Sequence, residues 1–580
     1  MKQYGLALFF LFFLIVGGLC IAWGENVQWI YVVALLTDLG LLTGLLWLLP
    51  KRWAVATAWL ISLPLFVLAV VDVFSASHFL MKISPEMLSM LINTNAQESA
   101  SFFASFGMMI LTDAKMLTLF TLLFLYIAGN ILIGIYHQKI ASLQLSRFLP
   151  NTRLCIIIGV LLMIAGFTLS WPQKRQFARL MGQHTVADME GLIFSAVNDN
   201  AYLPVYRFFF SLRAISLAEE EIALLRQTVA TAHIDSCSHR SPLIVLVIGE
   251  SYNRHHSQLY GYTLPTTPHQ EARRDSAQLT VFTDVVAPWN ITTNVFNQLF
   301  SLHHYGAQRP WSSYPLFPQL FRQAGYRVTF LTNQFDRFQL SRQFNQTGGF
   351  FLNDTTIFRA QFDEFNHRHK LDDGFFFYRN KELLVSSQPY RLDIIHLNGQ
   401  HFDYATRYPE DHRFFTAKDY PHRPLTQEQK EEVAHYDNAT RYNDEVMEDI
   451  LQFYADSTAI MIYLSDHGEE CYDDLPVKGR LYSELTARQV RQEFEIPFWI
   501  WCSKSYQQQY PETVNLIRAA ADRPFMTDRL PHLLLYLAGI HHTDYDEQLN
   551  LISPAYNSHI ARKLEGIVDY DTLMNGLNVK

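Results

Sequence analysis

Five long apolar segments near the start of the chain most constrain how it can fold. Each is close to the roughly 20 residues that a helix needs to cross a membrane. We therefore expect an all-α transmembrane domain of five helices over residues 1–171, with an outer loop over residues 75–115. The segments are Tyr4–Ala22, Trp29–Leu49, Trp53–Phe74, Met116–Tyr136 and Leu154–Trp171.

Basic residues between these segments predict their orientation. Lys and Arg are enriched in cytoplasmic loops. An amino terminus in the cytoplasm and an odd number of crossings then place everything after Trp171 on the outer side. The basic residues used are Lys2, then Lys51 and Arg52, then Lys139, Arg147 and Arg153.

Net charge and cysteine spacing argue against a nucleic-acid-binding protein and against a protein built on a Cys zinc site or a disulfide framework. The net charge of -9, with no basic stripe joined to aromatic platforms, argues against a nucleic-acid partner. The five Cys show no CxxC spacing, so neither a Cys zinc site nor a disulfide framework is supported. A single disulfide among Cys237, Cys471 and Cys502 stays open.

Residues 172–240 read as a connector between two domains. Leu203–Ile215 is aromatic on one side and basic at intervals, as expected for a helix that lies along a membrane surface. Ala218–Gln227 is a charged run that indicates a solvated helix face. We expect membrane-surface helices in this part of the chain.

From Pro242 onward, short apolar strands alternate with amphipathic stretches, which favours a mainly parallel sheet covered by helices. Helices are expected at Phe317–Gly325 and Glu431–Tyr454. We therefore expect residues 241–580 to form an α/β domain. The expected strands are Leu243–Ile248, Tyr326–Leu331, Leu392–His396 and Ala459–Leu464.

Polar clusters follow three of these strands. Glu250 comes after the first strand, His401 closes the cluster after the third, and Asp466 and His467 follow the fourth. Carboxylates and imidazoles that converge at strand ends suit a hard or borderline cation such as zinc. Gly468 allows the sharp turn that both Asp466 and His467 need to face one ion.

Hydroxyl groups in two stretches compete as the nucleophile of such a site. Ser251 directly follows Glu250, whereas Thr292 and Thr293 precede a helix expected to begin near Asn294. A hydroxyl at a helix start places a transferred phosphate near free backbone N–H groups. The same position also suits a simple helix cap, so the residues alone leave the nucleophile open.

Four stretches of the chain carry motifs that resemble one enzyme family. Together with the five apolar segments, they resemble the membrane-bound phosphoethanolamine transferases of Gram-negative bacteria. These enzymes belong to the alkaline phosphatase and sulfatase superfamily, so the resemblance implies a sulfatase-like fold for residues 241–580. The motifs are GESYNRHHSQLYGYTLPTTP (Gly249–Pro268), HLNGQHFDYATRYP (His396–Pro409), YDNATRYND (Tyr436–Asp444) and YLSDHGEE (Tyr463–Glu470).

The resemblance also implies a zinc ion and its ligands. By matching motifs, these are Glu250, Thr292, Asp466 and His467, with Thr292 as the catalytic nucleophile. The spacing of Thr292 from Leu299–Ser301 selects it over Thr293 and Ser251 within the family pattern.

Further residues match the family in binding or catalytic roles. His401 resembles a His near the phosphate or a second metal, and Asn333 resembles an Asn that contacts the donor. In the membrane loop, Thr94 and Glu98 fit an element implicated in binding the lipid donor, although Met90 stands where an Asn is expected.

The sequence departs from the family pattern in two places. Many members carry a second His about a dozen residues after the Asp-His pair, but Cys471–Tyr482 contains none, and Lys478 is the nearest cationic candidate. The disulfide-forming Cys set of the lipid A type is also missing. The chain therefore resembles more closely the type that acts on lipopolysaccharide core sugars or other periplasmic glycans.

The resemblance implies a monomeric, multi-pass enzyme of the bacterial inner membrane with a periplasmic catalytic domain. It would transfer phosphoethanolamine from phosphatidylethanolamine to lipopolysaccharide (core sugar or lipid A) or another periplasmic glycan, through a phosphoethanolamine–threonine intermediate. Alternatives are a phosphoglycerol transferase, a phosphate or sulfate ester hydrolase, or a non-catalytic membrane protein that binds lipid or glycan. A sulfatase would need a Cys or Ser in a Cys/Ser-x-Pro-x-Arg setting, and none lies near the expected site.

Overall fold

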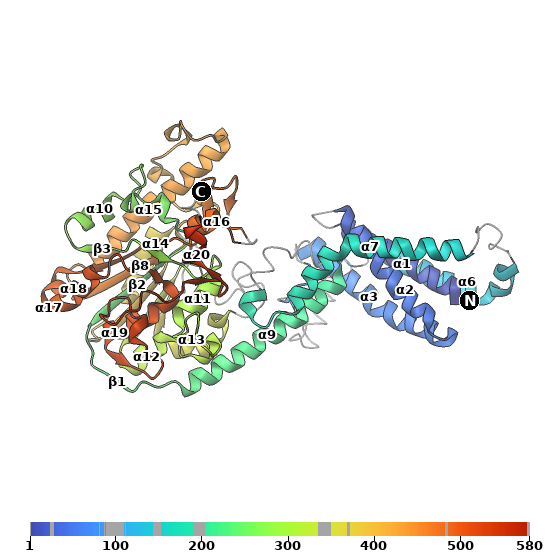
Figure 1. Cartoon of the computed structure of the whole chain (residues 1–580), viewed down its shortest axis with the longest axis horizontal. Coiled ribbons are helices and arrows are strands. Elements are labelled where there is room, and N and C mark those ends of the chain that lie inside the picture. The colour runs from blue at the N-terminus through green and yellow to red at the C-terminus, as the bar shows by residue number, and fades with distance from the viewer. Residues whose placement is uncertain are drawn as a thin grey trace. The chain divides into compact units, whose positions relative to one another are not determined.

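The computed structural model describes residues 2–23, 28–79, 82–85, 87–88, 110, 112–142, 152–189, 203–334, 350–367, 372–481 and 485–576. The chain divides into two compact units (Figure 1). The first is Met1–Glu219, and the second comprises Glu220–Asn345 and Gly349–Lys580.

The first unit contains the predicted apolar helices. Within the described residues, five helices are long and apolar enough to cross a membrane. Their outer faces carry exposed apolar side chains such as Leu48, Leu60 and Phe124, which lipid can cover. The helices are α1 (Lys2–Ala22), α2 (Trp29–Leu48), α3 (Lys51–Phe79), α6 (Ala114–Ser142) and α7 (Thr152–Met181).

Charged side chains inside this unit are paired with one another. Asp38 of α2 forms an ion pair with Lys174 of α7 and accepts a 2.7 Å hydrogen bond from the Tyr206 hydroxyl. Asp72 of α3 accepts a 2.9 Å hydrogen bond from Arg207 Nε. Pairing lowers the high cost of placing a charge in an apolar environment.

The predicted connector, residues 172–240, contains a long continuous helix and the end of the last apolar helix. Leu203–Ile215 and Ala218–Gln227 belong largely to one helix, α9 (Pro204–Thr231), and α7 continues past Trp171 to Met181. The boundary between the two compact units falls within α9, between Glu219 and Glu220. The domain limits at residues 171 and 240 stay predictions.

A seven-stranded sheet forms the centre of the second unit, in the order β3-β11-β8-β2-β7-β5-β6. The neighbouring strands β8, β2, β7, β5 and β6 pair in parallel, whereas β11 is antiparallel to both β8 and β3. The predicted mainly parallel sheet is therefore confirmed. The strands are β2 (Leu243–Gly249), β3 (Leu279–Val281), β5 (Arg327–Thr332), β6 (Glu364–Phe365), β7 (Arg391–His396), β8 (Ala459–Ser465) and β11 (Phe498–Cys502).

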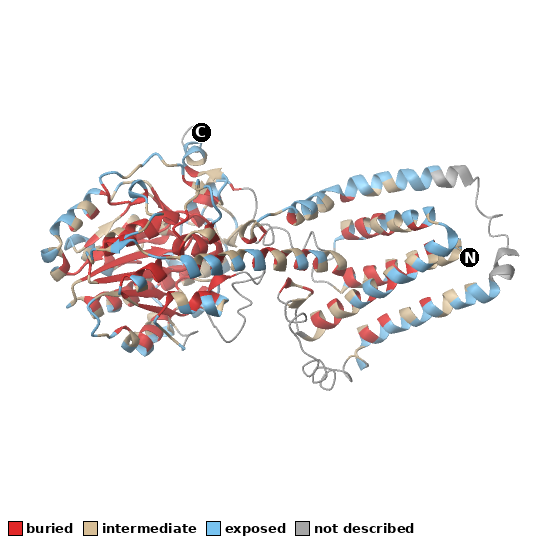
Figure 2. Ribbon diagram, turned by 90° about the horizontal axis from the view of Figure 1, so that it is seen from below, coloured by how far each residue is buried: buried red, intermediate tan, exposed pale blue. Residues whose placement is uncertain are grey.

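Helices cover both faces of this sheet, which explains why every residue of β2 is buried. Val245 and Val247 of β2 pack in one cluster with Val446 and Ile450 of α15. Figure 1 shows α14 and α15 on one side of the sheet and α11, α12 and α19 on the other, and Figure 2 shows the strands buried between them. The helices are α11 (Thr292–Phe300), α12 (Phe317–Gln323), α14 (Asp373–Asn380), α15 (Gln427–Tyr454) and α19 (Leu530–Ala538).

The strand register brings the predicted polar clusters to one edge of the sheet. Ile248 of β2 pairs with both His396 of β7 and Leu464 of β8, and His396 also pairs with Thr332 of β5. These four parallel strands therefore end at the same level. Ligand sites of open α/β sheets lie at this carboxyl edge.

The cysteines that the structure describes are not joined to one another. Cys237, Cys471 and Cys502 are all free thiols, so the disulfide left open by the sequence is not formed among them. Burial raises the pKa of the Cys502 thiol to about 12, which keeps it protonated and unreactive.

Candidate active site

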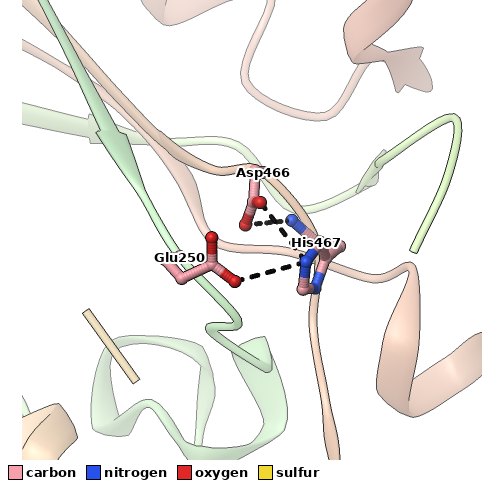
Figure 3. A group of neighbouring side chains, drawn as sticks. All are labelled: Glu250, Asp466 and His467. Atoms are coloured by element: carbon pink, nitrogen blue, oxygen red, sulfur yellow. Dashed lines mark hydrogen bonds and ion pairs between the residues drawn. The ribbon is translucent and has the colours of Figure 1, made fainter. Parts of the chain in front are cut away.

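Three predicted metal ligands meet at the carboxyl edge of the sheet (Figure 3). Glu250, Asp466 and His467 are fully buried, and each offers a ligand atom within 4.8 Å of the others. His467 Nε2 lies 3.3 Å from Glu250 Oε1 and 3.3 Å from Asp466 Oδ2. We call these three residues with Thr292 the acidic–histidine cluster.

Thr292 brings a hydroxyl group onto this cluster from the start of α11. Its Oγ1 donates a 3.2 Å hydrogen bond to Glu250 Oε2 and lies 3.3 Å from His467 Nε2. Ser251 Oγ also donates to Glu250, at 2.6 Å from Oε1. Of these two hydroxyls, Thr292 is the one that contacts both a carboxylate and the imidazole.

Two glycines allow the backbone to approach closely around the cluster. A Cβ on Gly399 would lie 2.7 Å from the Glu250 carbonyl oxygen, and the residue has a φ of +47°. A Cβ on Gly468 would lie 2.2 Å from the Gln492 carbonyl oxygen. The loops that carry His401 and His467 can therefore pack here only because these positions lack a side chain.

The donor set fits a zinc ion. His467 Nδ1 lies 2.8 Å from the Gly468 carbonyl, which can only accept, so Nδ1 carries the proton and Nε2 presents its lone pair to the cluster. Asp466 Oδ2 is buried without a hydrogen-bond partner. Burial and the nearby Glu250 carboxylate raise the pKa of Asp466 to about 7. A cation bound between these groups would offset the repulsion between the Asp466 and Glu250 carboxylates.

Gln334, which the sequence did not single out, holds Glu250 in place. Its Nε2 donates to Glu250 Oε2 at 3.0 Å and to the Leu397 carbonyl at 2.7 Å. Gln334 comes directly after Asn333, beyond the end of β5. The sequence could have indicated Gln334, because it is a polar residue just after β5, a parallel strand that ends at the same edge of the sheet as the candidate ligands.

Asn333 supports the loop after β7. Its Nδ2 donates a 2.9 Å hydrogen bond to Asp373 Oδ1. Asp373 in turn accepts hydrogen bonds from the backbone N–H groups of Asn398 and Gly399, each at 2.8 Å. The donor-binding role of Asn333 stays a prediction, and the predicted donor residues Thr94 and Glu98 lie outside the described residues.

His401 closes the same loop and is half-buried. Its backbone N–H donates to the Asn398 carbonyl at 3.2 Å. Burial lowers the pKa of the His401 imidazole, which favours its neutral form near neutral pH. His401 is not one of the three grouped ligand residues, and its catalytic role stays a prediction.

The cation that reaches the cluster is Arg480 and not Lys478. Lys478 Nζ donates to Glu432 at 2.8 Å and lies over the Phe402 ring, 5.2 Å from its centroid. Arg480 Nη1 lies 2.9 Å from His467 Nε2. The choice of Lys478 from the sequence is therefore wrong, because Gly479 between the two residues adopts a φ of +100° and their side chains reach different partners.

Comparison with known proteins identifies the family. The model of the family described as Sulfatase matches residues 242–540, which contain the whole cluster. The chain belongs to the sulfatase family. Curated relatives are the phosphoethanolamine transferases EptC of Escherichia coli (strain K12), 29% identical over 358 residues, and CptA of Salmonella typhimurium, 30% identical over 349 residues. These matches cover 59% and 57% of this chain and 59% and 58% of the relatives, so they span less than two thirds of each. The resemblance to phosphoethanolamine transferases is thereby confirmed.

Solved structures of this family share the fold. The periplasmic domain of EptC from Escherichia coli in complex with Zn aligns with 27% identity and a TM-score of 0.50, over 59% of this chain and 97% of that one. The integral membrane protein EptA of Neisseria meningitidis aligns with 16% identity and a TM-score of 0.50, over 94% of this chain and 97% of that one. The second alignment confirms the predicted architecture of apolar helices followed by a sulfatase-like domain.

Proposed function

We propose that this chain is a zinc-dependent phosphoethanolamine transferase with phosphatidylethanolamine as its donor. The observation that carries the proposal is the Thr292 hydroxyl, which lies within 3.3 Å of both Glu250 and His467. A hydroxyl among buried carboxylates and an imidazole is the arrangement that nucleophilic catalysis requires. The named relatives, which are phosphoethanolamine transferases, support the choice of the transferred group.

Glu250, Thr292, Asp466 and His467 would hold the zinc ion. When bound, zinc supplies a positive charge that favours the ionised hydroxyl and stabilises charge on phosphoryl oxygens. Glu250 Oε2 already accepts the Thr292 hydrogen bond, so it is placed to take the proton of this hydroxyl. Gln334 keeps that carboxylate oriented.

The transfer then needs two displacements at phosphorus. Thr292 Oγ1 forms a bond to the phosphorus, the bond to the diacylglycerol oxygen breaks, and that oxygen receives a proton. In the second step an acceptor hydroxyl attacks the phosphoethanolamine–threonine, loses its proton, and Thr292 leaves as the free hydroxyl. His401, neutral near neutral pH, would serve proton transfer or bind the phosphoryl group.

The membrane helices support a lipid donor and a lipid-linked acceptor. We propose a multi-pass protein of the bacterial inner membrane, with a cytoplasmic amino terminus and a periplasmic catalytic domain. The acceptor would be lipopolysaccharide, at a core sugar or lipid A, or another periplasmic glycan, and the protein would act as a monomer. The absence of a disulfide among Cys237, Cys471 and Cys502 suits the core-sugar type better than the disulfide-rich lipid A type.

The proposal is tested with the purified full chain loaded with zinc and given headgroup-labelled phosphatidylethanolamine. We expect release of diacylglycerol and transfer of label to purified lipopolysaccharide, both lost in Thr292→Ala when that variant is assayed with enough zinc to saturate its remaining ligands. Release from phosphatidylglycerol alone would replace the proposal with phosphoglycerol transfer. Release of free phosphoethanolamine in the presence of every acceptor would indicate a hydrolase, and no release from either lipid would contradict an enzymatic role.

A further inference from the structure

Arg480 points a permanent positive charge at the acidic–histidine cluster. Its Nη1 lies 2.9 Å from His467 Nε2 and donates a 3.1 Å hydrogen bond to the carbonyl of Asn290. Asn290 is only two residues before Thr292. The guanidinium group therefore lies between the chain segment that carries the nucleophile and the imidazole that faces the cluster.

The fold fixes Arg480 in this position. Strands β9 (Glu470–Cys471) and β10 (Lys478–Gly479) form a hairpin that returns the chain toward the residues after β8. Gly479, the last residue of β10, has a φ of +100°, which a residue with a side chain rarely adopts, so the backbone direction just before Arg480 depends on glycine.

The residue that follows Arg480 is anchored on both its backbone groups. Leu481 N–H donates to Glu493 Oε1 at 2.9 Å, and its carbonyl accepts from Asn290 Nδ2 at 3.1 Å. Glu493 also accepts from Asn290 Nδ2, at 2.7 Å from Oε2. The loop that presents Arg480 is therefore tied to the same segment that precedes the nucleophile.

A guanidinium N–H and a metal ion cannot share one lone pair. His467 Nε2 can either accept from Arg480 or bind zinc, so zinc binding requires the guanidinium to find another acceptor. A cation next to zinc is also repelled unless an anion lies between them. An anion held by the metal and by Arg480 together satisfies both conditions.

We propose that Arg480 binds a non-bridging oxygen of the phosphoryl group that is transferred at Thr292. This inference rests on the proposed function, since it names a binding residue for the same substrate phosphate. Arginine suits this task because its planar group donates parallel hydrogen bonds to phosphate oxygens and keeps its charge at any physiological pH. Lysine would supply the charge without the planar pair of donors.

The chain offers a matched control for this test. Lys478 lies two residues before Arg480 in the same hairpin, but its ammonium group pairs with Glu432. Changing Lys478 to Gln therefore removes one positive charge from the hairpin without removing a contact to the cluster. We compare R480Q, R480K and K478Q in the full chain.

The first measurement is the affinity of the zinc-loaded protein for inorganic phosphate, by calorimetry, with zinc content determined on the same samples. We expect R480Q to bind phosphate about 10- to 100-fold more weakly, as for loss of a charged hydrogen bond. R480K should lie between R480Q and wild type, and K478Q should match wild type. Equal affinity of R480Q and wild type, no phosphate binding by wild type, or loss of zinc from R480Q would each overturn the proposal.

The second measurement separates this proposal from the proposed function. Diacylglycerol release from phosphatidylethanolamine is measured for wild type, R480Q and K478Q. Phosphate binding that depends on Arg480 without any release by wild type would leave the phosphate site standing and refute the transferase. Release by wild type that R480Q fully retains would refute the role of Arg480 and leave the transferase standing.

Discussion

Replacing Gln334 by Leu should weaken zinc binding without changing any ligand. The substitution removes the 3.0 Å hydrogen bond to Glu250 Oε2 and leaves the buried carboxylate less constrained. A hydrogen bond to a charged group contributes about 1.5–3 kcal/mol. Loss of a group that orients a metal ligand typically lowers metal affinity about 10- to 100-fold.

The assay is competition for zinc between the full chain and a chelator of known affinity. Gln361→Leu is the matched control, because Gln361 is also a buried glutamine of the second unit but bonds to Gln319. We expect Gln334→Leu to raise the zinc dissociation constant about 10- to 100-fold and Gln361→Leu to leave it unchanged. Equal zinc affinity of Gln334→Leu and wild type would show that Gln334 does not hold Glu250 for the metal, as would an equal loss in both variants.

Two further predictions concern the frame around the site. His256 lies between Asp437 and Asp473, at 2.5 and 2.9 Å, and although burial opposes its charge, the two carboxylates raise its pKa from 6.5 to about 10. A pKa that is higher in the folded than in the unfolded protein stabilises the fold at pH values below the unfolded pKa, and this stabilisation is lost as pH rises to the folded pKa. The free energy of unfolding, measured in urea, should therefore fall as pH rises from 6.5 to about 10. His256→Gln should flatten this dependence. Gly399→Ala should lower the free energy of unfolding by about 1–3 kcal/mol and also weaken zinc binding, because its Cβ meets the Glu250 backbone. Unchanged stability and zinc affinity of that variant would show that the loop moves away without cost.

The four central parallel strands and the convergence of three candidate metal ligands could be predicted because both depend on local patterns. Each buried strand is a short apolar run, and the polar residue after it must lie at the carboxyl edge. Glu250, Asp466 and His467 therefore meet in the structure as the sequence indicates. Strand β11 was not predicted. Its place at the antiparallel side of the sheet depends on its pairing with β8 and β3, which the apolar run Phe498–Cys502 does not reveal.

The residues that the sequence did not reveal depend on tertiary structure. Arg480 reaches His467 only because β9 and β10 pair and Gly479 adopts a positive φ. Lys478 has the same charge and nearly the same place in the sequence, yet it binds Glu432. Spacing along the chain does not distinguish these two cations, whereas in the structure the positive φ of Gly479 lies between them and they contact different partners.

Mapping the covalent intermediate shows directly which hydroxyl is the nucleophile. Zinc-loaded full chain is mixed with headgroup-labelled phosphatidylethanolamine in the absence of acceptor, quenched, and mapped by peptide mass spectrometry. We expect phosphoethanolamine on Thr292 and its transfer to lipopolysaccharide when acceptor is added. Label on Ser251 or Thr293, or turnover with no labelled peptide, would contradict Thr292 as the nucleophile.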